Sequence, residues 1–156
     1  MAAIDKELVK AKGGVIAPQH YNATTDSYEA VQGANGASFV TIKNPVSDVT
    51  LQNAVTAIGN GTKFSPTDGN YILTFEIVGT STSRTVAFEI AGPSGTYVPC
   101  TGFNVTDPKR FSTETTGGNN TVPESWQVEV PAGYSFRTRV SAVAGGNVTV
   151  KGKAVI

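Results

Sequence analysis

Apolar and polar residues alternate along much of the chain between residues 71 and 156. A period of two places the apolar side chains on one face of a β-strand. The pattern recurs in segments 71–78, 84–91, 125–130, 134–143 and 147–155. The predicted inward residues are Tyr71, Leu73, Phe75, Ile77, Val86, Phe88, Ile90, Trp126, Val128, Val130, Tyr134, Phe136, Val140, Ala142, Val148, Val150 and Ala154. The pattern therefore predicts a series of half-buried strands.

Short turn-rich connections predict that consecutive segments form antiparallel hairpins. The stretch GTSTS would join the first two segments and place Phe75 opposite Phe88. The connections 131–133 and 144–146 both end in glycine, which suits the left-handed third position of a three-residue hairpin loop. A one-residue slip would turn apolar faces outward, so the register is well specified. The sequence predicts a three-stranded antiparallel meander over 125–155.

The N-terminal part of the chain has a different character. Residues 1–40 carry charges, paired glycines and the spaced aromatics Tyr21, Tyr28 and Phe39, but few core-forming runs. Such a segment gains order by packing on another chain, because termini stay mobile unless they are tied down. We expect an extended N-terminal assembly arm over 1–40 and a β-domain over 41–156. A strand is predicted at 38–43, and the stretch 50–58 is ambiguous.

Composition supports a sheet protein. The chain has 19 Val and 8 Ile against 3 Leu, together with 20 Thr, and residues branched at Cβ fit a pleated sheet better than a helix. Strands with one apolar face need a second layer to cover that face. The predicted fold class is all-β, an antiparallel β-sandwich, with a jelly-roll-like topology as one form of it.

Charge and hydropathy limit the partners. The 12 basic and 12 acidic residues balance, whereas general nucleic-acid binding needs an excess of cations. No apolar run approaches the roughly 20 residues of a spanning helix. The N-terminus carries charges where a signal peptide has its apolar stretch. We expect no nucleic-acid partner, no membrane partner and no export through a signal peptide.

Candidate catalytic groups are few. His20 is the one histidine, and it lies between a proline and a polar turn without a supporting motif. Glu76, Glu89 and Glu129 take outward strand positions, which favours a solvated sheet face over a glycosidase pair. Cys100 is expected to be a small buried residue, with a reactive thiol as the alternative. The sequence predicts no catalytic residue, no metal site and no cofactor.

Aromatic side chains can form a surface that binds carbohydrate, and the chain offers a few candidates for it. Trp126 shares a face with Val128 and Val130, so a core position is favoured. The better candidates for contact with a sugar are Tyr97, and Tyr21 or Tyr28 in the arm, although packing or an interface is favoured for each of them.

Four cations form the most distinctive surface that the predicted register creates. Arg139 would lie opposite Lys151, and Arg137 opposite Lys153. Like charges directly opposite one another destabilise a sheet. Either an acidic partner surface or anionic glycan covers this face, or Glu129 and acids from other strands neutralise it.

Three segments resemble a known class of proteins. Residues 10–39, KAKGGVIAPQHYNATTDSYEAVQGANGASF, resemble the N-terminal segment of small structural proteins in tailed phages of Gram-positive hosts. Residues 75–97 and 135–155, FEIVGTSTSRTVAFEIAGPSGTY and SFRTRVSAVAGGNVTVKGKAV, are similar to a β-rich domain of those proteins. The resemblance implies a virion component without enzymatic activity, and it brings no catalytic or ligand residues.

These observations together predict a non-enzymatic structural component of a phage virion. It would belong to the tail or baseplate, or act as a host-adhesion accessory protein. Its expected partners are copies of itself and other virion proteins, and its location is the virion, with the host cytoplasm during assembly. The alternatives are a capsid decoration or head-fibre protein, and a carbohydrate-binding module for host-surface glycans.

Overall fold

The protein is described from a computed structural model. The structure describes residues 7–10, 13–14, 16, 18–30, 33–34, 37–38, 46–107, 109–115 and 122–156. The chain divides into two compact units, residues 1–43 and residues 44–156. All regular structure in the described residues is β, and no helix occurs among them, which confirms the all-β class.

The described part of the first unit holds two short antiparallel hairpins. In one, β1 (Gln19–Asn22) pairs with β2 (Ser27–Ala30), and in the other β3 (Gly33–Ala34) pairs with β4 (Ala37–Ser38). The strand predicted at 38–43 meets β4 at its first residue. Its remainder, including Phe39, lies outside the described residues.

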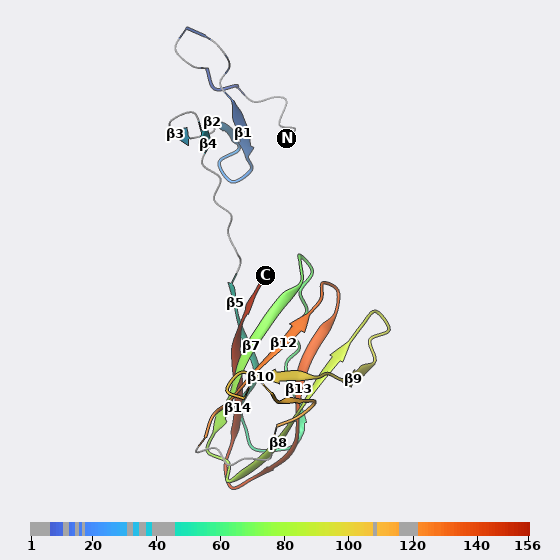
Figure 1. The fold of residues 1–156 in the computed structure, drawn as a ribbon. Coiled ribbons are helices and arrows are strands. Elements are labelled where there is room, and N and C mark those ends of the chain that lie inside the picture. Colours follow the sequence, from blue (N-terminus) through green and yellow to red (C-terminus); the bar gives the residue numbers. More distant parts are fainter. Residues whose placement is uncertain are drawn as a thin grey trace. The chain divides into compact units, whose positions relative to one another are not determined.

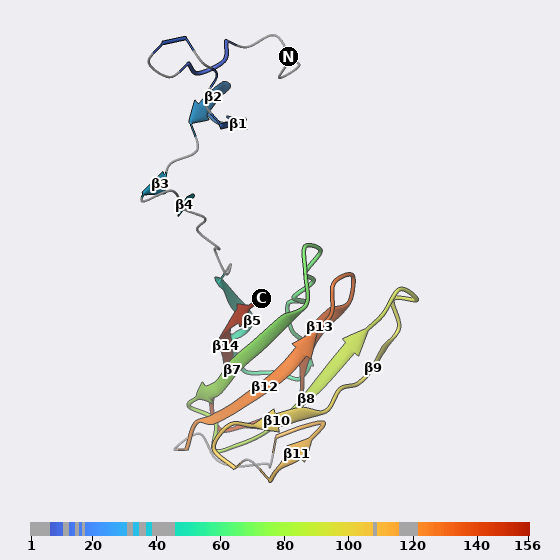
Figure 2. The ribbon, with the colours of Figure 1, turned by 45° about the horizontal axis from the view of Figure 1, so that its top comes forward.

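The second unit contains two antiparallel sheets (Figures 1 and 2). The larger sheet has the spatial order β11 (Phe111–Ser112), β10 (Gly102–Asn104), β12 (Glu124–Val130), β7 (Tyr71–Gly79), β14 (Val148–Val155) and β5 (Val46–Val55). The smaller sheet has the order β6 (Gly59–Asn60), β13 (Ser135–Ala144), β8 (Ser83–Ala91) and β9 (Tyr97–Pro99). Of the stretch 50–58, ambiguous in sequence, residues 50–55 belong to β5 and residues 56–58 follow it.

One apolar core lies between these sheets, which confirms the sandwich. The rings of Phe75 in β7 and Phe88 in β8 are 5.3 Å apart, and Phe88 is 5.0 Å from Trp126 in β12. Trp126 is fully buried, as its position in the pattern predicted. Most of the predicted inward residues are buried, namely Tyr71, Leu73, Phe75, Ile77, Val86, Phe88, Trp126, Val128, Val130, Phe136, Val140, Val148, Val150 and Ala154.

The predicted hairpins are wrong, because consecutive strands belong to opposite sheets. β7 pairs with β12 and β14, while β8 pairs with β13 and β9. The meander over 125–155 is wrong for the same reason, since β13 leaves the sheet that contains β12 and β14. Alternation fixes which face of each strand is buried, but it does not distinguish a neighbour in the sheet from a strand across the core. Phe75 and Phe88 do meet, but across the core.

Two predicted inward residues are exposed. A β-bulge interrupts the pairing of β13 between Val140 and Ala142, and beyond it the alternation is inverted. Ala142 therefore faces outward, and Val143 packs against the core instead. Tyr134 lies just before β13 and is 37% exposed.

The glycines of the two connecting loops differ in role. Gly133 adopts the expected left-handed conformation, with φ of 79°. In the loop between β13 and β14 the left-handed residue is Gly145, with φ of 68°. The next residue, Gly146, allows a close approach, since a Cβ there would lie 2.3 Å from the carbonyl oxygen of Thr80.

Candidate functional site

The four cations predicted to share one surface lie on two different sheets. Arg137 and Arg139 are on β13, whereas Lys151 and Lys153 are on β14. The pairings observed are Arg137 with Glu89, Arg139 with Ala87 and Asn60, Lys151 with Glu76 and Thr50, and Lys153 with Thr74 and Asp48. The predicted register, with arginines opposite lysines, is therefore wrong, because β13 and β14 are not neighbours.

Two acids from other strands pair with three of these four cations, an arrangement of the kind that the second interpretation of the sequence described. On the smaller sheet, Glu89 Oε2 accepts a hydrogen bond from Arg137 Nε at 2.8 Å, and its Oε1 accepts one from Arg139 Nε at 2.7 Å. Burial alone would raise the pKa of Glu89, but the hydrogen bonds and charges of the two arginines outweigh it. The pKa of Glu89 therefore lies below its ordinary value. Glu129, named in the same interpretation, lies on the other sheet.

Tyr97 completes this cluster on the smaller sheet. The Arg137 guanidinium lies 3.7 Å from the centre of the Tyr97 ring, a cation–π contact. The Glu89 side chain is only 13% exposed, whereas that of Arg139 is 42% exposed. The outer face of the smaller sheet is thus an organised network of ion pairs, with Tyr97 as a packing residue.

The outer face of the larger sheet is an ordered grid of side chains. One row crosses the sheet through directly paired positions, and its members are Asp48, Lys153, Thr74, Gln127, Phe103 and Phe111. On one side of it lies the row Thr50, Lys151, Glu76 and Ser125, and on the other the row Val46, Val155, Ile72 and Glu129. These rows bring together residues that are far apart in the sequence.

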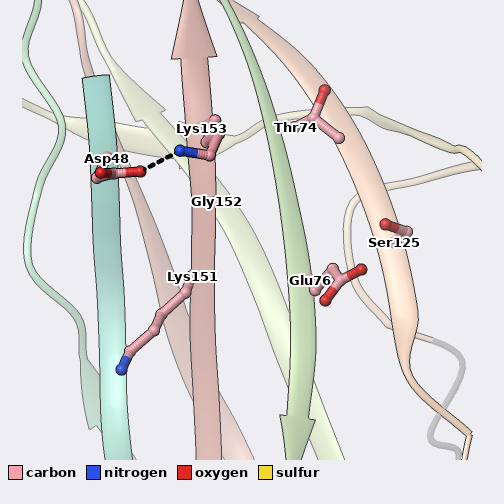
Figure 3. A pocket seen from close by; sticks show the side chains of 7 residues that line it. All are labelled: Asp48, Thr74, Glu76, Ser125, Lys151, Gly152 and Lys153. Carbon is pink, nitrogen blue, oxygen red and sulfur yellow. Dashed lines mark hydrogen bonds and ion pairs between the residues drawn. The ribbon is translucent and has the colours of Figure 1, made fainter. Parts of the chain in front are cut away.

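A depression of about 550 Å³ opens between the first two rows. Its lining residues are Asp48, Thr74, Glu76, Ser125, Lys151, Gly152 and Lys153, and Figure 3 shows their arrangement. Lys153 Nζ donates to Asp48 Oδ1 at 2.7 Å, whereas the Lys151 side chain points away from that pair. The backbone at Gly152 forms part of the floor. Hydroxyl, carboxylate and ammonium groups surround the depression, but most of its exposed lining is carbon.

A second depression, of about 260 Å³, is lined by aromatic, apolar and polar side chains. Its lining residues are Ile72, Thr101, Phe103, Phe111, Gln127, Val128 and Glu129. The rings of Phe103 and Phe111 are 5.5 Å apart, and Phe111 is 66% exposed. Sequence analysis did not single out either phenylalanine. The available clue was two phenylalanines flanking the turn-forming stretch 104–110.

The aromatic residues of the N-terminal unit form a local contact. Tyr21 and Tyr28 are opposite one another in the β1–β2 hairpin, with ring centres 5.7 Å apart. The Tyr21 hydroxyl donates to Asp26, and this hydrogen bond raises the pKa of Tyr21. The two tyrosines are thus held together on a short hairpin. Phe39, the third predicted interface residue of this segment, lies outside the described residues.

A buried ion pair crosses from one sheet to the other. Arg84 on β8 is fully buried and lies 3.9 Å from Glu124 on β12. Its Nη2 also donates to the carbonyl oxygen of Ile77 at 3.1 Å. Burial lowers the pKa of Arg84, and the charge of Glu124 opposes that shift. The pair connects the two layers of the sandwich, and sequence analysis did not identify it.

The candidate catalytic groups of the sequence belong to different elements, His20 to β1 and Cys100 to the segment after β9. The His20 side chain is 60% exposed, and its Nε2 lies 4.0 Å from a carboxylate oxygen of Glu29. Cys100 is partly buried against the core, and burial raises the pKa of its thiol. No group of three or more His, Cys, Asp or Glu side chains suited to a metal occurs in the described residues. None of the described segments forms a helix long and apolar enough to cross a membrane.

Comparison with known families adds to this geometry. The family model of XepA matches residues 45–154, which is well over half of the chain. The chain belongs to the XepA family. No match was found among curated proteins.

Two solved structures are similar to this chain. SPBc2 prophage-derived protein YomS is 28% identical, covers 76% of this chain and is itself covered completely, with a TM-score of 0.66. PBSX exported protein XepA is 21% identical and covers 97% of this chain, with a TM-score of 0.70. The chain spans about half of XepA, 49% of its length, and at this identity the likeness concerns the fold. The match to the family model and the similarity to YomS together identify a phage-related, β-rich protein.

Proposed function

We propose that this protein is a non-enzymatic structural component of a phage virion, part of the tail or baseplate or a host-adhesion accessory protein. Membership of the XepA family, together with similarity to a prophage-derived protein over that protein's full length, carries the proposal. The side chains also favour a structural role. Two arginines bind the Glu89 carboxylate, and burial raises the pKa of the Cys100 thiol, which disfavours the reactive thiolate.

The N-terminal unit is the proposed assembly element. It forms a compact unit of its own, and none of its described residues belongs to the apolar core of the second unit. Tyr21 and Tyr28 present paired rings on a short hairpin, and such aromatics are common in protein interfaces. We propose that they contact copies of this chain and other virion proteins. The balanced charge favours protein partners over nucleic acid or membrane.

The proposed location is the virion, with the host cytoplasm during assembly. XepA is described as an exported phage protein, and this supports a final location outside the cytoplasm. The contact of the four cations with an acidic partner stays a prediction. It now concerns two separate surfaces, because Arg137 and Arg139 lie on the smaller sheet and Lys151 and Lys153 on the larger one.

The test is mass spectrometry of purified particles from an induced prophage that encodes this chain, with heads and tails separated. We expect the chain in the tail fraction at a fixed ratio to known tail proteins. Purified protein should show no turnover on glycan, peptide and ester substrates. Recovery in heads would support the capsid-decoration or head-fibre alternative instead. Absence from both fractions, or turnover that a His20→Ala variant abolishes, would contradict the proposal.

A further inference from the structure

The two depressions on the larger sheet adjoin at one pair of residues. Thr74 lines the first depression, and Gln127 lines the second. These residues are directly paired across β7 and β12, and Gln127 Nε2 donates to Thr74 Oγ1 at 3.1 Å. The two depressions therefore form one shallow path across the sheet, from the charged residues of β14 to the aromatic residues of β10 and β11. We propose that this path binds an extended, neutral oligosaccharide.

The aromatic end supplies a stacking surface. A sugar ring has an apolar C–H face that packs on an aromatic ring and leaves the hydroxyl groups at its rim. Phe111 offers such a ring, because it is 66% exposed, and Phe103 supports it from 5.5 Å away. Glu129 and Thr101 lie beside these rings in the same depression. A carboxylate and a hydroxyl at that position match the hydroxyl groups around a stacked sugar.

The end of the path at β14 has a mostly carbon surface with hydrogen-bonding groups around it. Thr74, Ser125 and Glu76 line the first depression from two adjacent strands, and Figure 3 shows their oxygens on its side of the sheet. Neighbouring strands lie about 4.8 Å apart, comparable to the length of one sugar residue. Successive sugars of a chain laid across the strands would therefore meet successive strands, each with its own polar side chain.

The charges of this face favour a neutral glycan over a protein or a polyanion. A protein interface has a core depleted of charged residues, but Lys151, Lys153, Asp48 and Glu76 all line the larger depression. Asp48 is paired with Lys153, so these residues present no excess of cations for an anionic polymer. Hydroxyl and amide groups, which donate and accept without a net charge, suit such a mixed surface.

The proposal adds a ligand to the structural role and does not depend on it. The test is titration calorimetry of the full-length protein with chitotetraose, cellotetraose and maltotetraose, and with a heparin tetrasaccharide as the anionic comparison. We expect saturable binding of at least one neutral probe and none of heparin. Phe111→Ala should weaken that binding about tenfold, since it removes the stacking ring. Glu129→Gln should weaken it as well, without touching the aromatic pair.

The matched control is Val98→Ala. Val98 is a 52% exposed residue of β9, on the smaller sheet, so this variant should bind the glycan as the wild type does. Circular dichroism and melting temperature would show that each variant is folded. Absence of binding to all three neutral probes overturns the proposal. So does binding of heparin alone, equal binding by both site variants and the wild type, or an equal loss in Val98→Ala.

Discussion

The single carboxylate of Glu89 accepts hydrogen bonds from two arginines. Arg137 and Arg139 approach its two oxygens from the neighbouring strand, and Tyr97 stacks on one of the guanidinium groups. Hydrogen bonds between charged groups are stronger than neutral ones, particularly when the acceptor is mostly withdrawn from water. The cluster therefore stabilises the junction of β8 and β13.

Replacing this carboxylate should cost stability. Glu89→Gln leaves both arginines without their charged acceptor, and we expect a loss of about 1–2 kcal/mol, because solvent around the exposed Arg139 screens part of the interaction. Urea unfolding at neutral pH measures it. Glu114→Gln is the control, since Glu114 is exposed and forms no ion pair with another described residue. An unchanged unfolding free energy in Glu89→Gln would mean that the cluster contributes nothing.

The same variant carries a pH signature. The pKa of Glu89 is depressed in the folded protein, so its contribution is complete above the unfolded value, near 4.3. This contribution to stability is lost as the pH falls through the lower pKa that Glu89 has in the folded protein. The difference in unfolding free energy between wild type and Glu89→Gln should therefore shrink in unfolding experiments carried from pH 7 to pH 3.

The residue spacing alone placed Arg137 and Arg139 on one face, but their acceptor depends on a strand pairing that the sequence did not reveal.

Among the elements, β14 shows how closely strands approach in the larger sheet. A Cβ on Gly152 would lie 2.1 Å from the carbonyl oxygen of Thr74 and 2.7 Å from Cα of Phe75. Both are backbone atoms of β7, which cannot move without disturbing the sheet. Gly152 also forms part of the floor of the larger depression.

Gly152→Ala should therefore destabilise the protein by about 1–3 kcal/mol, as overpacking typically does. Chemical denaturation measures the loss. Gly59→Ala is the matched control, because Gly59 also lies in a strand and a Cβ there would meet no atom within 4 Å. If the two variants had equal stability, the close approach of β14 to β7 would be disproved.

The buried face of most strands could be predicted, but their neighbours could not. Alternation correctly placed Phe75, Phe88 and Phe136 in the core. The loops after β12 and β13 have the length and the glycines of a hairpin loop. Loops with these same features here connect strands of opposite sheets. The inward turn of Val143 depends on a β-bulge, which no pattern of residues indicated.

At the scale of the whole molecule, the apolar core found among the described residues belongs to the second unit. Its buried residues run from Val49 to Ala154, inside residues 44–156. The candidate ligand surface was not predictable, because its rows join residues such as Phe103, Gln127 and Thr74, which become neighbours only when distant strands pair. The division into an arm over 1–40 and a β-domain over 41–156 stays a prediction, which rests on the content of apolar runs.

Removal of residues 1–43 should leave a folded domain that no longer enters particles. The remaining chain keeps its complete core, so it should unfold cooperatively with a melting temperature close to that of the full chain. Complementation of a deletion phage with the truncated gene, followed by mass spectrometry of particles, tests incorporation. Normal incorporation would show that the first unit is not the assembly element.

The pairing of β5 with β14 has a consequence for synthesis on the ribosome. Asp48 and Lys153, which meet across these strands, are 105 residues apart in sequence. The strands on either side of β7 likewise come from the last third of the chain. Because such long-range contacts raise the contact order, the chain gains little from local pairing as it emerges. The sandwich can close only after its final strand, β14, has left the ribosome, so the earlier strands of this domain emerge before their partners.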